Sequence, residues 1–157
     1  YLFLLQSSLS EKIIKRKKIL KMKKFNKSER GKFRYWFAHW CSFQMVALLY
    51  GMWKPKYLLH DIEKPWLMLL WRNDYSRVQK WHREHADHHL EYGKGMLNMD
   101  IEATLIDWEC SRFTKEAAPK TALETYNMIY EKSSGYKRQV LEDYFLPVLK
   151  KYDGFFK

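Results

Sequence analysis

The chain has 157 residues, a formal net charge of +11, 46% hydrophobic residues and 17% aromatic residues. This composition excludes a disordered protein, and the length suits one domain with a single core. The two cysteines, Cys41 and Cys110, are far apart and form no CxxC pair, which excludes a zinc finger and fits a reducing compartment.

The basic charge is concentrated at the N-terminus, where residues 1–30 carry ten Lys or Arg and two Glu, and so +8 of the +11. We interpret residues 1–28 as a basic arm that can contact nucleic acid, ahead of a domain at 29–157. The first methionine is Met22, and the residues before it are rich in Lys, Arg and Ile. An A-rich ribosome-binding region ahead of a start codon would give such residues if it were translated in frame. Two interpretations therefore stay open: a natural start at Met22, or a genuine basic tail.

Helices are expected along the rest of the chain, and no strand is expected. The first predicted helices cover 29–52, then 55–64 between Pro55 and Pro65, then one long helix or two over 66–72 and 74–91 with Asn73-Asp74 as a cap. After a loop at 93–95, further helices are expected over 101–115 behind Asp100, from Pro119 to about 132, and over 136–152 with a kink at Pro147. The predicted fold class is all-α, a single compact domain of about five to seven helices.

The uncharged stretch from Tyr35 to Trp53 is about as long as a membrane span. His39 and two further polar residues fall within it, so we favour a buried central helix that carries a functional histidine, and we do not expect a membrane protein. The simplest role for the tryptophans is in the core, and this expectation covers Trp36, Trp40, Trp66, Trp71 and Trp108.

A histidine cluster follows in "WHREHADHHLEY", which places four of the six histidines within eight residues: His82, His85, His88 and His89. At about 100° per residue, the four share one face of a helix, and Asp87 lies off that face. Neutral imidazoles on one stripe suit a transition metal. Of the four, His82 is expected to be a solvated residue of the helix surface.

Oxygen donors come from two other segments. The pentapeptide "HDIEK" places His60 beside Asp61, with Lys64 one turn further on, and Asp107 lies in "ATLIDWECSRF". The neighbours of Asp107 at three and four residues are all small: Ala103, Thr104, Cys110 and Ser111. Such a groove lets another helix or a metal cluster approach closely.

The order His39, His60-Asp61, histidine cluster, Asp107 resembles the HD-domain superfamily of metal-dependent phosphohydrolases. That signature is a histidine on an early helix, a His-Asp doublet and a distal aspartate, with further histidines between them in two-metal members. More narrowly, "HDIEKP", "WHREHADHHLEY" and "IDWECSRFTKEAAPKTALETY" resemble a poorly characterised family of short phage and bacterial proteins with His-Asp-x-x-Lys, His-His-x-Glu-Tyr and Asp-Trp motifs. The resemblance covers about residues 35–130 and implies an HD-like helical domain in the cytoplasm of a bacterium or a phage-infected cell.

The resemblance also implies a site. His39, His60, Asp61 and Asp107 would hold one metal ion, and two or more of His85, His88 and His89 would hold a second ion or contact phosphate. The donors suit one or two divalent transition metals, namely Mn, Fe, Co, Ni or Zn.

The implied reaction is the hydrolysis of a phosphoester of a nucleotide or related small molecule by metal-activated water. Asp61 is the expected catalytic carboxylate, and Lys64 and Arg112 would neutralise charge on the phosphoryl oxygens. Glu63 departs from this pattern, because a carboxylate there would repel phosphate unless it binds a metal or pairs with Lys64.

Two alternatives stay open: a non-enzymatic protein of the same fold that binds nucleic acid or a host protein, and a di-iron HD-type oxygenase. A ferritin-like di-iron bundle fits less well, because it needs Glu-x-x-His pairs and no histidine here has a glutamate three residues before it.

Overall fold

The computed structural model describes residues 27–71, 74–90, 99–115 and 120–152, and every regular element within these ranges is a helix. The predicted all-α, single compact domain is therefore confirmed. Several features of the sequence lie outside the described residues: the basic arm up to residue 26, the end of the His-His-x-Glu-Tyr motif, the loop at 93–95 and Pro119.

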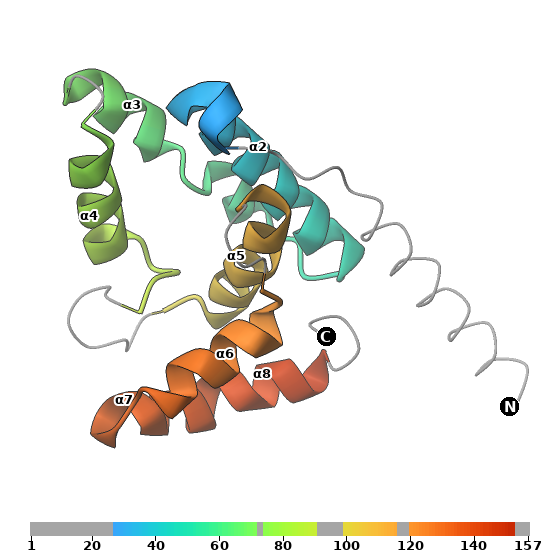
Figure 1. Ribbon diagram of the computed structural model, residues 1–157. Helices are drawn as coiled ribbons and strands as arrows, with labels where there is room; N and C mark the ends of the chain where they lie inside the picture. The colour runs from blue at the N-terminus through green and yellow to red at the C-terminus, as the bar shows by residue number, and fades with distance from the viewer. Residues whose placement is uncertain (1–26, 72–73, 91–98, 116–119, 153–157) are drawn as a thin grey trace, which may run out of the picture.

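Two helices form the centre of the domain, α2 (Lys27–Leu49) and α5 (Ile101–Thr114) (Figure 1). They pack against each other more extensively than any other pair of described elements. Gly31 bends the start of α2 with a φ of 66°, a left-handed conformation that favours glycine. Phe43 on α2 and Ile106 on α5 are fully buried in the shared core, so the interface between these helices is apolar apart from the polar groups described below.

A second pair of helices, α3 (Glu63–Leu70) and α4 (Tyr75–His85), lies beside α2 and follows the short 3-10 helix η1 (Pro55–Leu59). The prediction of one helix over 55–64 ended by Pro65 is wrong. The chain leaves the helical conformation earlier, at His60-Asp61, and a new helix, α3, begins at Glu63. Pro65 lies in the first turn of α3 and does not end a helix, because a backbone N–H in the first turn has no helical partner to lose.

The prediction of a helix over 74–91 is correct at its start and wrong at its end. Asp74 caps α4, accepting a hydrogen bond from the backbone N–H of Arg77 at 3.2 Å. The helix ends at His85, because Ala86 adopts an extended conformation with a ψ of 128°. His88 and His89 therefore lie in the turn that follows the helix.

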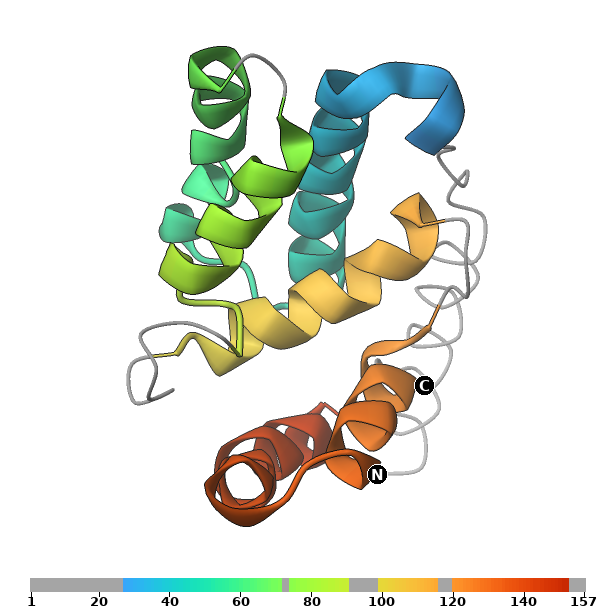
Figure 2. The same cartoon turned by 60° about the vertical axis from the view of Figure 1, so that its left-hand side comes forward.

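The C-terminal helices form a separate layer against α5 (Figure 2): α6 (Ala122–Glu131), α7 (Gly135–Val140), the π-helical turn η3 (Leu141–Phe145) and α8 (Leu146–Lys151). Thr121 and Glu124 form a capping box at the start of α6. The irregularity expected at Pro147 appears as η3, just before it, where the N–H of Leu146 donates to the carbonyl of Leu141. A π-turn of this kind accommodates a proline that cannot donate a hydrogen bond.

Glu109 connects three parts of this framework. Its Oε1 accepts from the hydroxyl of Tyr50 at 2.8 Å, and its Oε2 accepts from the backbone N–H of Ala122 at 2.9 Å. Arg112 Nη2 lies 2.9 Å from Oε1, so the carboxylate is buried with an opposite charge beside it. The network ties the end of α2 and the start of α6 to α5.

Among the described residues, no helix is long and apolar enough to cross a membrane. The stretch from Tyr35 to Trp53 instead contributes the central helix, as expected, with Phe43 and Val46 fully buried. The expectation that the tryptophans lie in the core is wrong for Trp66, whose surface is 70% exposed. The other four are only half-buried, and of these Trp108 packs against the core.

Candidate metal centre

The His60-Asp61 doublet lies in a sharp turn of the backbone. Asp61 has a φ of +60°, a left-handed conformation that costs a residue other than glycine about 1 kcal/mol. The indole Nε1 of Trp36 donates to the backbone oxygen of Asp61 at 2.8 Å and helps to hold the turn. The ring of His60 stacks on that of Phe43, with centroids 3.6 Å apart. As a result, both side chains of the doublet are buried beside α2 and α5.

This turn brings together four residues from separate parts of the chain. His39 Nε2 on α2 lies 2.8 Å from Asp107 Oδ1 on α5 and 3.7 Å from Asp61 Oδ2. His60 Nε2 lies 3.6 Å from Asp61 Oδ1 and 3.7 Å from Asp107 Oδ1. All four side chains point to a common region, which is the arrangement a shared cation needs. The small neighbours of Asp107 are all buried, and α2 packs along this helix.

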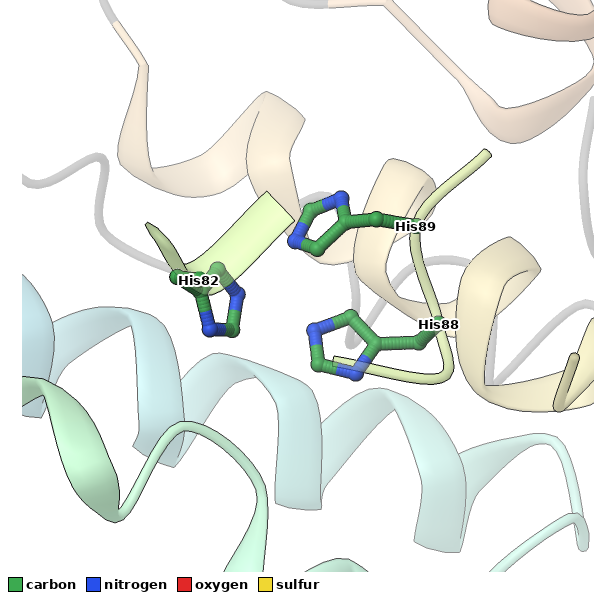
Figure 3. Close-up of side chains that lie close together, drawn as sticks. All are labelled: His82, His88 and His89. Carbon is green, nitrogen blue, oxygen red and sulfur yellow. The ribbon is translucent and has the colours of Figure 1, made fainter. Parts of the chain in front are cut away.

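A group of three histidines adjoins these four residues. Figure 3 shows the rings of His82, His88 and His89 turned toward one another, and one ring nitrogen of each lies within 4.8 Å of the others. Asp61 joins the two groups, since its Oδ1 is 3.1 Å from His82 Nε2 and 3.4 Å from His88 Nε2.

The central atoms of this cluster are buried and have no hydrogen-bond partner: His60 Nε2, Asp61 Oδ1, His82 Nε2, His88 Nε2 and His89 Nε2. A buried polar atom without a partner costs about 1–3 kcal/mol, so five in one cluster point to an ion or to water molecules that bind them. Donors held at about 2.1 Å from one ion are separated by about 3.0–3.4 Å in octahedral or tetrahedral geometry. The distances from Asp61 Oδ1 to His82 and His88 agree with this spacing. The residues therefore fit a divalent metal ion.

In His82 and His39, the second ring nitrogen has a partner that orients the imidazole. His82 Nδ1 hydrogen-bonds to Glu63 Oε1, and His39 Nδ1 lies 3.4 Å from the hydroxyl of Thr114. Metal-binding histidines typically have such partners, which direct the second nitrogen at the ion. Glu63, expected either to bind a metal or to pair with Lys64, is thus paired with His82, and its Oε1 also lies close enough to Asp61 and His82 to share an ion with them.

The histidines differ in their protonation. Burial lowers the pKa of His60 well below its usual value and that of His89 to about 3, so both rings are neutral and offer a lone pair. Burial also opposes a charge on His88, but Asp61 and Asp87 outweigh it and raise its pKa to about 9. An ion bound by His88 must therefore displace a proton.

Both aspartates are ionised. Burial works against the charge on Asp61, but interactions with His60 and Lys64 outweigh it and hold its pKa well below the usual range. For Asp107, burial is likewise outweighed by His39, and the pKa is low. Lys64, predicted to face a phosphate, is itself buried, with its Nζ 2.5 Å from Asp61 Oδ2. The structure therefore places Lys64 in an ion pair with Asp61, a carboxylate of the candidate metal centre.

The structure reverses the predictions for the exposure of His82 and His85. His82, expected on the solvated surface, is fully buried, whereas His85 is exposed and stacks on Trp81 with centroids 4.2 Å apart. His85 Nδ1 donates to the backbone oxygen of Trp81 at 2.7 Å. The prediction that the four histidines share one helix face is wrong, because α4 ends at His85 and the last two histidines lie beyond it. The sequence feature that could have predicted the burial of His82 is its position four residues after Val78, a buried apolar residue on the same side of α4.

Arg112 does not join the cluster in the described structure. Its guanidinium is bound to Glu109, whose remaining contacts hold Tyr50 and Ala122. The helical spacing from Asp107 to Arg112 exceeds one turn, so the two side chains leave α5 in different directions. The predicted contact of Arg112 with phosphate has no support in this geometry.

A pocket of about 350 Å³ adjoins the cluster. Its lining includes His60, Asp61, Glu63, His85 and His88, together with Lys56, Tyr57, Asp87 and Asp100. This volume is at the lower end of the range for small-molecule sites. Asp87, expected to face away, thus lies beside the cluster, with its Oδ1 3.7 Å from His88 Nδ1.

Fold and site together define an all-α protein with a buried cluster of histidines and aspartates that could bind metal. No family model, no curated protein and no solved structure matches this chain.

Proposed function

We propose that this protein is a metal-dependent phosphohydrolase of the HD type, acting on a phosphoester of a nucleotide or a related small molecule. The observation that supports the proposal most is the convergence of five buried, unpartnered donor atoms around Asp61. Together with His39 and Asp107, which lie close to Asp61 and His60, their residues follow the chain order of the superfamily that the sequence motifs resemble.

In this proposal, His39, His60, Asp61 and Asp107 hold one ion, and His82, His88 and His89 hold a second ion close to Asp61. A divalent ion supplies Lewis acidity and lowers the pKa of bound water from about 16 toward about 7. The chain's own residues orient the donors: Glu63 fixes the ring of His82, and Lys64 offsets the charge of Asp61. Burial of the donors keeps bulk water away from them.

The charge of the pocket explains why metal would be essential. Carboxylates of Asp61, Glu63, Asp87 and Asp100 line it, and the cation Lys56 is already paired, with its Nζ 2.5 Å from Asp100 Oδ2. These four carboxylates outnumber the cations of the wall, Lys56 and the protonated His88, so without bound metal ions the wall repels phosphate. Binding of a phosphorylated substrate therefore depends on the positive charge of the ions, and activity should vanish completely with chelation.

The test combines elemental analysis of protein purified without chelators with phosphate release from a panel of nucleotides and generic phosphodiesters, with Mn added. We expect about one or two divalent ions per chain and turnover that chelation abolishes. His60→Ala and Asp61→Ala should lose metal and turnover, whereas Asp143→Ala, an exposed aspartate of η3, should keep both. Metal-free wild-type protein, or turnover unchanged in Asp61→Ala, would refute the proposal.

The three-histidine group favours one alternative, a di-iron oxygenase, because imidazole also suits iron. Iron with a visible absorption band and no phosphate release would indicate this activity. Metal without turnover, together with binding of nucleic acid, would instead indicate the non-enzymatic protein.

A further inference from the structure

Helix α3 is apolar on the side that faces solvent as well as on the side that faces the protein. Lys64 and Met68 are buried, while Trp66, Leu69 and Leu70 are 70%, 73% and 70% exposed. Ile62, just before the helix, is 43% exposed and lies four residues before Trp66. A helix with a second apolar side is expected to bury it against something.

The start of α2 extends this surface. Phe33 and Phe37 lie one turn apart and are 59% and 53% exposed. The Nε1 atoms of Trp36 and Trp40 donate to the backbone oxygens of Asp61 and Leu58, so the aromatic side of α2 is joined to the segment that leads into α3. Figures 1 and 2 show the first half of α2 and α3 side by side. We call Phe33, Phe37, Ile62, Trp66, Leu69 and Leu70 the α2–α3 apolar face.

The α2–α3 apolar face is large for a soluble monomer. An aromatic side chain presents about 150–250 Å², and three aromatics and three aliphatic residues at these exposures add up to several hundred Å². Contiguous apolar patches of that size mark interaction sites. Since the side chains stand out from the surface, with exposures up to 73%, they are placed to enter a partner and do not line a hollow.

The charges near the α2 part of this face are positive, and Asp74 is an exposed carboxylate at the end of α3. The sequence has no Asp or Glu from residue 30 to residue 60, and the exposed Lys32 and Arg34 flank Phe33. Glu63 is turned toward His82. Residues 1–30, which lead into α2, carry a net +8. A symmetric contact with a second copy would set these positive charges against each other, and the chain's own basic arm would be repelled as well. These charges therefore favour an anionic partner.

We infer that the α2–α3 apolar face docks onto an anionic lipid bilayer. Trp, Phe and Leu side chains enter the boundary between headgroups and acyl chains, and adjacent Lys and Arg contact the anionic headgroups. Nucleic acid satisfies the charges but gives protruding Leu69 and Leu70 nothing apolar to enter. The protein lies on the bilayer without crossing it. This inference stands apart from the proposed hydrolysis, and neither depends on the other.

The test is co-sedimentation of the full chain with vesicles of phosphatidylcholine containing about 30% phosphatidylserine, and with pure phosphatidylcholine vesicles. We expect binding to the anionic vesicles that weakens with salt, and little binding to the neutral ones. Leu69→Ser with Leu70→Ser should weaken binding at least tenfold. The matched control is Tyr144→Ser, which removes a residue 57% exposed on η3, away from this face, and should bind like the wild type.

Folding of each variant is checked by circular dichroism, and Arg34→Glu offers a second test without loss of apolar packing. It should weaken binding to anionic vesicles alone. Quenching of tryptophan fluorescence by lipids brominated on the acyl chains should fall in Trp66→Phe. The inference is overturned by equal binding to both vesicle types, by no binding, or by unchanged binding in the leucine variant. It is also overturned if the leucine variant instead breaks up a dimer or abolishes nucleic-acid binding.

Discussion

Nε2 of His82 lies 3.1 Å from Oδ1 of Asp61, and neither atom has a hydrogen-bond partner although both are buried. The other nitrogen of His82 is held by Glu63, so the ring cannot turn Nδ1 toward the aspartate without losing that bond. The pair therefore presents one lone pair from each side to the same point. His88 Nε2 also lies close to this oxygen, at 3.4 Å, but its ring must first lose a proton before it offers a lone pair.

Binding of a metal should stabilise the fold. An ion that binds the native state at about one hundred times its Kd adds about 2.7 kcal/mol, and a domain of this size gains about 2–4 °C in Tm for each kcal/mol. We therefore expect Mn or Zn to raise the Tm by about 5–10 °C in differential scanning fluorimetry, and a chelator to reverse the rise. An equal rise in Asp61→Ala would show that the ion binds elsewhere.

His82→Ala should lower metal affinity far more than His85→Ala. Both histidines lie on α4, but His82 faces the cluster and His85 is bonded to Trp81. Isothermal titration with Zn, or metal content after dialysis, measures the difference. The reverse order would mean that the turn after α4 is arranged differently in solution.

Glu63→Gln should reduce metal affinity about 10–100-fold, because the carboxylate that accepts from His82 orients the ring and strengthens it as a ligand. The fold should be unaffected, since Glu63 is only partly buried. Glu84→Gln changes an exposed carboxylate on the neighbouring helix α4 and serves as the control. If both variants bind metal like the wild type, Glu63 has no part in orienting His82.

Glu109→Ala should destabilise the protein by about 3–5 kcal/mol, because it leaves Arg112 without its partner and removes the acceptor of Tyr50 and Ala122. Urea unfolding followed by circular dichroism measures the loss. Glu142→Ala, which removes an exposed carboxylate 3.8 Å from Arg138, should cost less than about 1 kcal/mol. Comparable losses in the two variants would contradict the role assigned to the Glu109 network.

Helix starts and donor types followed from local patterns in the sequence. Asp74 and Asp100 each cap a helix as expected, because a cap needs only the backbone N–H three residues away. The small residues around Asp107 predicted a close approach to another helix, and α2 packs there. These features depend on neighbours within one or two turns, so the sequence alone contains them.

The contacts of the charged and aromatic residues could not be predicted from local patterns in the sequence. Lys64 was expected at a phosphate and lies against Asp61, Arg112 pairs with Glu109, and Trp66 faces solvent. Each of these long side chains can reach several partners. The choice among them depends on which helices lie within reach once the domain is packed.

By itself, the sequence determined an all-helical domain and an ordered set of histidines and aspartates, because helical periodicity and residue chemistry are local properties. Only the tertiary structure decided which histidines meet at Asp61. That choice depends on the end of α4 at His85, on the left-handed turn at Asp61, and on the packing of α2 against α5. Contacts between residues far apart in the chain exist only after packing, so no local pattern specifies them.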